Sequence, residues 1–152
     1  MRLSSPTTCR GVTLIELAVA VAVMGILAAV AYPNYTAYVK RSRRADAMAL
    51  LTSVVQAQER YRANKTAYAA ELTDLNLSAQ SITRYYTVEI AGVGAMPSLT
   101  SGYLATASVV SGGPQARDAD CATLAIKLEG ARLTYLATNS AGADTRATCW
   151  GR

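Results

Sequence analysis

Few side chains in this 152-residue sequence could take part in chemistry, because it contains no histidine and only three cysteines. Histidine is the usual general base near neutral pH and the commonest metal ligand. The cysteines (Cys9, Cys121 and Cys149) form no Cys-x-x-Cys pair, and no motif pairs a serine or cysteine nucleophile with a base. The sequence therefore predicts a protein that is not an enzyme and that holds no cofactor or metal.

Glu16 is the only charged residue in the apolar run of residues 12–32. At about 1.5 Å per residue, a helix of that length covers about 31 Å, which matches the hydrocarbon thickness of a bilayer. A carboxylate inside a spanning helix is a functional-site candidate that needs a partner. No cationic side chain lies three or four residues from Glu16, so we expect the partner to come from another chain or from an amine that proteolysis exposes.

The apolar run has two other interpretations, a secretory signal peptide and a helix of a protein core. Ala29 and Ala31 form an A-x-A cleavage site just before Tyr32, which is the argument for a signal peptide. Against it, the run is longer than a typical signal-peptide core, and a disposable leader has little reason to carry Glu16. We therefore favour a permanent anchor and keep cleavage after Ala31 as the alternative.

Residues 9–17, with the sequence CRGVTLIEL, resemble the prepilin processing site of type IV pilins. The resemblance implies that a prepilin peptidase removes residues 1–11 by cleaving between Gly11 and Val12, and that Val12 is then N-methylated. It also implies that Glu16 neutralises the Val12 amine of a neighbouring subunit in a filament, although the Val12 amine of the same chain is a competing partner. Val12 departs from the family, which most often has phenylalanine there.

Two further positions match the family, Gly25 and Pro33, where pilins carry helix-weakening residues. Glycine lowers helix propensity and proline removes an internal hydrogen bond, so this segment is expected to kink or open most readily. Close packing between helices is the other explanation for Gly25. The expected packing surface of the apolar helix consists of Leu14, Ile15, Leu17, Val21, Met24 and Leu27.

Residues 33–64 are predicted to form an amphipathic helix, and residues 65–152 the rest of a globular domain. One apolar stripe comprises Ala47, Leu50, Val54, Ala57 and Tyr61, and a second comprises Met48, Leu51 and Val55. Residues 84–91, 102–110, 121–128 and 131–137 are strand candidates, and Glu129 and Gly130 indicate a hairpin turn. The expected fold is α+β, with a long N-terminal helix packed on a four-stranded antiparallel sheet.

The tail of residues 139–152 shows little periodicity, so a covalent link is expected to hold it to the rest of the domain. Cys121 and Cys149 can close a loop there, and loss of Cys9 with the leader would leave an even number of cysteines. Two buried free thiols are the alternative. In pilins such a disulfide bounds the C-terminal segment exposed on the filament. A disulfide places this part of the chain in an oxidising compartment, here the periplasm.

Basic residues are concentrated in the N-terminal part of the chain, chiefly Lys40, Arg41, Arg43 and Arg44. This cluster is expected to be a solvated or headgroup-facing helix flank rather than a nucleic-acid site. The positive-inside rule alone would place it in the cytoplasm, in conflict with the cysteines. We prefer the periplasmic orientation, because the cluster begins beyond Pro33 and a continuing helix would hold it off the membrane.

The favoured function is that of a structural subunit of a type IV pilus, major or PilE-like minor, inserted in the inner membrane before it joins an extracellular filament for adhesion, twitching motility or DNA uptake. The resemblance implies three kinds of partner: other pilin subunits, prepilin peptidase, and an assembly platform with its ATPase. One alternative is a DNA-binding competence pilin that uses the basic cluster with Arg117, Arg132, Arg146 and Arg152, and Trp150 or an exposed tyrosine for stacking. Another is a type II secretion pseudopilin with calcium near Asp118 and Asp120, although a solvated loop is the expected role of these two acids.

Overall fold

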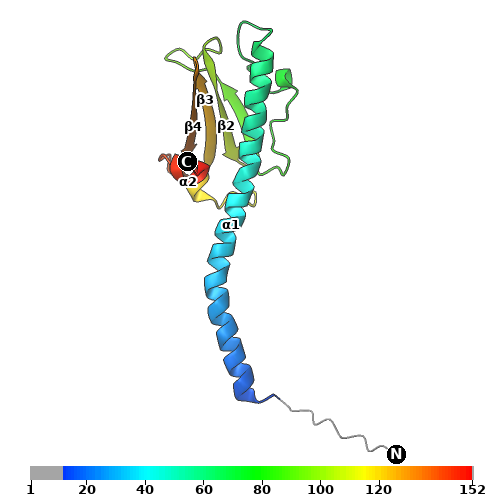
Figure 1. The fold of residues 1–152 in the computed structure, drawn as a ribbon, viewed down its shortest axis with the longest axis vertical. Coiled ribbons are helices and arrows are strands. Elements are labelled where there is room, and N and C mark those ends of the chain that lie inside the picture. The colour runs from blue at the N-terminus through cyan, green and yellow to red at the C-terminus, as the bar shows by residue number, and fades with distance from the viewer. Residues whose placement is uncertain (1–11, 152) are drawn as a thin grey trace, which may run out of the picture. The chain divides into compact units, whose positions relative to one another are not determined.

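The computed structural model describes residues 12–151, which divide into two compact units (Figure 1). The first ends at Tyr38 and is called the N-terminal unit; the second begins at Val39 and is called the globular unit. Helix α1 (Leu14–Arg62) contributes to both. Pro33 lies inside this helix, so the change from apolar anchor to amphipathic helix expected at residues 32 and 33 is not marked by a break in secondary structure.

The sheet of the globular unit is an antiparallel meander with strand order β1-β2-β3-β4. Its strands are β1 (Tyr86–Ala91), β2 (Gly102–Val109), β3 (Thr123–Glu129) and β4 (Arg132–Thr138). The tight turn between β3 and β4 contains Gly130 at φ 60°, a left-handed conformation that glycine adopts at little cost. The predicted α+β fold, a long N-terminal helix on a four-stranded antiparallel sheet, is confirmed.

Two strands begin two residues later than predicted, for local backbone reasons. Arg84 has φ 59°, so the chain turns there and β1 begins only at Tyr86. Cys121 belongs to a short 3-10 helix, η2 (Ala119–Cys121), which delays β3 to Thr123. At the other end of the unit, α1 stops at Arg62, two residues before the predicted end at Asn64.

One core forms where residues 44–58 of α1 lie against the sheet. The helix contributes Ala47, Leu51, Val54 and Ala57, all at most 4% exposed. Leu51 was predicted for the second stripe, whereas Leu50 of the first stripe is only half-buried. The sheet contributes buried side chains from all four strands: Tyr86, Val88, Tyr103, Ala105, Ala107, Leu124, Ile126, Leu128 and Ala137.

The segment between α1 and β1 is fixed to the helix by Gln58, a fully buried side chain that the apolar stripes did not single out. Its amide donates to the carbonyl of Ala69 at 2.9 Å and accepts from the nitrogen of Ala69 at 2.9 Å. Both polar ends are therefore satisfied, which is what a buried amide requires. The segment then forms the 3-10 helix η1 (Thr73–Leu75) before it approaches β1.

The C-terminal tail is more ordered than its lack of periodicity suggested. It contains a short helix, α2 (Arg146–Trp150), that contacts β4. The Trp150 ring lies 4.8 Å from that of Tyr135 between centroids, and its Nε1 donates to the carbonyl of Leu136 at 2.8 Å. Cys121 and Cys149 form a disulfide with their Cα atoms 5.8 Å apart, so the tail is held both covalently and by packing.

Candidate functional site

The first turn of α1 holds Glu16 through a reciprocal pair of contacts with Thr13. The Glu16 nitrogen donates to Thr13 Oγ1 at 3.3 Å, while the Thr13 nitrogen and hydroxyl each approach Glu16 Oε2 at 3.4 Å. This is a capping box, in which a threonine before the helix and a glutamate three residues later satisfy each other's backbone donors. Glu16 is therefore folded back on its own helix end, and among residues 12–151 it is not paired with a cation.

The rest of the described N-terminal unit is an apolar helix whose large hydrophobic side chains are exposed. It is the one helix of the described chain that is long and apolar enough to cross a membrane. The six residues of the expected packing surface are between 57% and 88% exposed: Leu14, Ile15, Leu17, Val21, Met24 and Leu27. Such a continuous apolar surface is unfavourable in water, so lipid or other protein must cover it.

The two predicted helix-weakening residues lie in regular helix. Gly25 has open space around the position of a Cβ atom, so nothing in the single chain requires a glycine there. Pro33 cannot donate to the carbonyl four residues earlier, and polar side chains next to it bond to helix carbonyls. Asn34 donates to the carbonyl of Val30 at 3.0 Å and Thr36 to that of Pro33 at 2.9 Å.

Arg44 and Asp118 form a buried ion pair in the globular unit. Nε and a terminal nitrogen of Arg44 donate to the two Asp118 carboxylate oxygens, both at 2.7 Å. The Arg44 side chain is 8% exposed and that of Asp118 is 0% exposed. The predictions of a solvated Arg44 and a solvated loop around Asp118 are therefore wrong, because each charge is matched by the other across a sequence distance that composition does not reveal.

Gln115 extends this pair into a small network. Its Nε2 donates to Asp118 Oδ2 at 2.7 Å and to the carbonyl of Lys40 at 3.2 Å, so the loop before η2 is tied to α1 at two positions. The hydrogen bond to Asp118 raises the pKa of the Arg44 guanidinium above its ordinary value. Burial raises the pKa of the neighbouring Tyr86 to about 12.

Other members of the predicted basic set have separate environments. Arg43 donates to the carbonyl of Pro114 at 3.0 Å and lies over the Tyr85 ring at 5.0 Å. Arg41 is exposed and lines a groove of about 480 Å³ beside α2. Arg117 and Arg146 are also exposed. Trp150 is half-buried against β4, so it is not an exposed stacking platform. The other candidate for stacking, an exposed tyrosine, is present in Tyr35 and Tyr38 of α1.

The calcium hypothesis for Asp118 and Asp120 fails on the same network. Both oxygens of Asp118 already accept hydrogen bonds from Arg44 and Gln115. Among the described residues, no group of three or more histidine, cysteine, aspartate or glutamate side chains could hold a metal ion. Asp118 is therefore occupied as the partner of Arg44.

Two family profiles match the sequence. One, described as type IV minor pilin ComP, DNA uptake sequence receptor, covers residues 33–125, and the other, the prokaryotic N-terminal methylation motif, covers residues 7–32. The chain is a type IV pilin. The first profile alone covers more than half of the chain, and the fold agrees with the assignment.

Individual relatives of this pilin include one fimbrial protein and two type IV major pilin proteins. It is 34% identical over 119 residues to the fimbrial protein EcpC of Eikenella corrodens, a match that covers 78% of this chain and 73% of EcpC. It is 35% identical over 85 residues to the type IV major pilin protein PilE of Neisseria gonorrhoeae, covering 55% of this chain and 51% of PilE. It is 36% identical over 83 residues to the type IV major pilin protein PilA of Myxococcus xanthus, covering 54% of this chain and 38% of PilA.

Some predicted positions of the pilin lie outside the described residues: the leader of residues 1–11 with Cys9 and Gly11, and the terminal Arg152. Of the two residues flanking the predicted cleavage point, the structure describes only Val12, which is 73% exposed at the start of the N-terminal unit. The structure thus places Val12 and Glu16 at the same end of α1.

Sequence reasoning missed the Thr13–Glu16 capping box and the Arg44–Asp118 pair. The first had a signal, because threonine followed three residues later by glutamate at the start of an apolar run is the capping-box pattern. The second had none, because two opposite charges far apart in the sequence become partners only when the loop before η2 folds onto α1.

Proposed function

We propose that this pilin is a structural subunit of a type IV pilus, cleaved between Gly11 and Val12, N-methylated on Val12, and polymerised through the apolar part of α1. The observation that carries the proposal is the exposed apolar helix of the N-terminal unit with Glu16 in its first turn. In the inner-membrane precursor, lipid covers this helix and the globular unit lies in the periplasm. In the filament, the same helices of other subunits replace the lipid.

Glu16 sets the axial alignment of each subunit's α1 with that of its neighbour in this assembly. A carboxylate among apolar helices is costly unless a cation pairs with it, and processing creates a cation at Val12 of each subunit. Pairing of Glu16 with the Val12 amine of a neighbour satisfies both groups. The capping contacts to Thr13, at 3.3 to 3.4 Å and exposed, are weak enough to be exchanged for this charged pair. The remaining partners are prepilin peptidase and the assembly platform with its ATPase.

Mass spectrometry of sheared, purified filaments tests the proposal. The expected mature chain begins at Val12, carries one added methyl group on its amine, and retains the Cys121–Cys149 disulfide. A filament subunit or secreted chain that begins at Tyr32 would contradict it, because that chain would lack both Val12 and Glu16. Absence of the chain from all filaments of its host would contradict it too.

A second candidate function is DNA capture by the filament, since the family profile over residues 33–125 is described as that of a DNA uptake sequence receptor. Arg41, Arg117 and Arg146 are three exposed arginines of the predicted set, and they would contact phosphates. Arg41 shares its groove with residues of α2, and the Gln115 and Asp118 contacts hold the loop of Arg117 on α1. These three side chains are therefore presented by neighbouring elements of the globular unit.

A gel-shift titration of the full chain in detergent at low salt tests DNA binding. We expect duplex DNA to be retarded, and each charge reversal among Arg41, Arg117 and Arg146 to reduce the slope of log K against log salt by about 0.9. Arg60→Glu, which makes the same charge change at an exposed position near the C-terminal end of α1 and outside the predicted DNA-binding set, is the matched control and is expected to keep the slope. No retardation by the wild-type chain would remove this function and leave the structural one intact.

A further inference from the structure

β1 is an edge strand, because within the described sheet it pairs with β2 on one side only. Thr87 and Glu89 exchange hydrogen bonds with β2, as the register and the bond from Val110 to the carbonyl of Tyr85 require. In an antiparallel ladder, the residues between two such hydrogen-bonded residues point their N–H and C=O groups away from the neighbouring strand. The N–H and C=O groups of Val88 and Ile90 therefore face outward.

The segment before β1 covers the first part of this edge and leaves the second part open. The Ser81 nitrogen donates to the carbonyl of Tyr86 at 2.9 Å, and the Val88 nitrogen donates to the carbonyl of Ala79 at 2.7 Å. N-terminal to Ala79 the segment lies away from the strand. Within the described part of the chain, the Val88 carbonyl and both main-chain groups of Ile90 have no hydrogen-bond partner.

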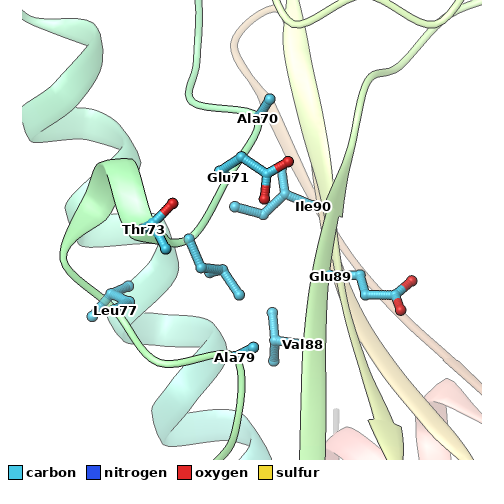
Figure 2. A pocket seen from close by; sticks show the side chains of 9 residues that line it. Ala70, Glu71, Thr73, Leu77, Ala79, Val88, Glu89 and Ile90 are labelled. Atoms are coloured by element: carbon cyan, nitrogen blue, oxygen red, sulfur yellow. The ribbon is translucent and has the colours of Figure 1, made fainter.

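A groove of about 410 Å³ lies at this open part of the edge (Figure 2). Val88 and Ile90 line its strand side, and Leu72 and Leu77 line the side formed by the segment between α1 and β1. Val88 and Leu72 are buried at its base, so the half-buried Ile90 and Leu77 provide its accessible apolar surface. The groove therefore combines unpaired main-chain groups with apolar side-chain sites. Those are the two features by which a sheet edge binds an extended peptide, the first for affinity and the second for specificity.

The charge around the groove selects the kind of peptide. Glu71 and Glu89 are its charged lining residues, both exposed, and no basic residue lines it. Figure 2 shows Glu71 on the groove side of β1 and Glu89 pointing away on the other side of the strand. A strand bound here would thus have a carboxylate near each of its two faces, which favours basic side chains.

We propose that the open edge of β1 is a docking site for an extended, basic polypeptide segment of a partner protein, which pairs with Val88 and Ile90 as a fifth strand. The bound segment lies along β1 next to residues 79–81 and fills the groove between Leu72 and Ile90. This inference goes beyond the filament function and does not depend on it, because the site lies wholly within the globular unit.

Amide hydrogen exchange on the full chain in detergent micelles tests the site. In the free chain, the Ile90 amide is expected to exchange much faster than the Val88 amide, which is bonded to Ala79. The probe is an eight-residue peptide of alternating valine and lysine at millimolar concentration, and the matched control is the same peptide with glutamate in place of lysine. The lysine peptide is expected to slow Ile90 exchange by about tenfold, the effect of one added hydrogen bond.

Two variants separate the main-chain contact from the fold. Ile90→Pro removes the outward N–H without removing a bond to β2, so it is expected to keep the fold. The lysine peptide is expected to change the NMR chemical shift of the Val88 amide in the wild-type chain but not in Ile90→Pro. Ile90→Val keeps the N–H and is expected to retain this change. Slow exchange of Ile90 in the free wild-type chain, no protection by the lysine peptide, or equal protection by the glutamate peptide would each overturn the proposal.

Discussion

An Asp118→Ala variant is expected to unfold with a free energy about 3 to 5 kcal/mol below that of the wild type, the usual cost of removing one partner of a buried ion pair. The reason is that Arg44 stays in place with a side chain only 8% exposed and loses both of its 2.7 Å acceptors. Gln115 loses its 2.7 Å acceptor as well, which frees the loop before η2. Urea unfolding followed by the fluorescence of Trp150, the single tryptophan, measures the change.

Two further variants identify the cause. Asp120→Ala, two residues away at an exposed position, is expected to change stability by no more than about 0.5 kcal/mol. Arg44→Met combined with Asp118→Leu removes both charges and is expected to recover most of the loss, because an apolar pair of similar volume often replaces a buried ion pair at little cost. If Asp118→Ala were as stable as the wild type, the pair would not hold the loop on α1.

The elements of this fold were predictable from sequence because each carries a local pattern. The helix up to residue 62 shows apolar residues at three- and four-residue spacing, and Tyr86, Val88 and Ile90 alternate along β1. The errors lie where a single backbone angle sets the end of an element, as at Arg84 with its positive φ. They also lie in the C-terminal tail, which folds only in contact with the rest of the globular unit. Helix α2 is too short to be stable alone, and its order comes from Trp150 on β4 and the Cys121–Cys149 disulfide.

The sequence draws attention to Glu16 but not to Arg44, for different physical reasons. Glu16 stands out because a carboxylate in an apolar run violates the expected pattern, and such violations usually mark function. Arg44 did not stand out, because a basic residue beside Arg43 on an amphipathic helix fits the pattern of a solvated flank. Its burial depends on Asp118, and this long-range pairing is information that only the folded chain contains.

A Glu16→Gln variant is expected to be inserted and processed but to form no filaments. Glutamine can replace glutamate in a capping box, so the contact with Thr13 and the start of α1 are retained. The neutral amide leaves the Val12 ammonium of the adjoining subunit unpaired among apolar helices. At about 3 kcal/mol per interface, this loss lowers each subunit's association constant by about 100-fold or more. Electron microscopy and an immunoblot of the sheared fraction measure filaments, and the ratio of precursor to mature chain measures processing.

A Thr13→Val variant distinguishes the effect of the Glu16 charge on assembly from the effect of the Thr13–Glu16 helix cap. It removes the hydroxyl that accepts from the Glu16 nitrogen at 3.3 Å but keeps the carboxylate, and loss of a cap costs only about 1 kcal/mol of helix stability. Filaments are therefore expected in Thr13→Val cells and not in Glu16→Gln cells. Normal piliation with Glu16→Gln would show that packing of the apolar face alone sets the register, since Leu14, Ile15 and Leu17 are unchanged in that variant. Loss of filaments in both variants would instead assign the effect to the first turn of α1 and not to its charge.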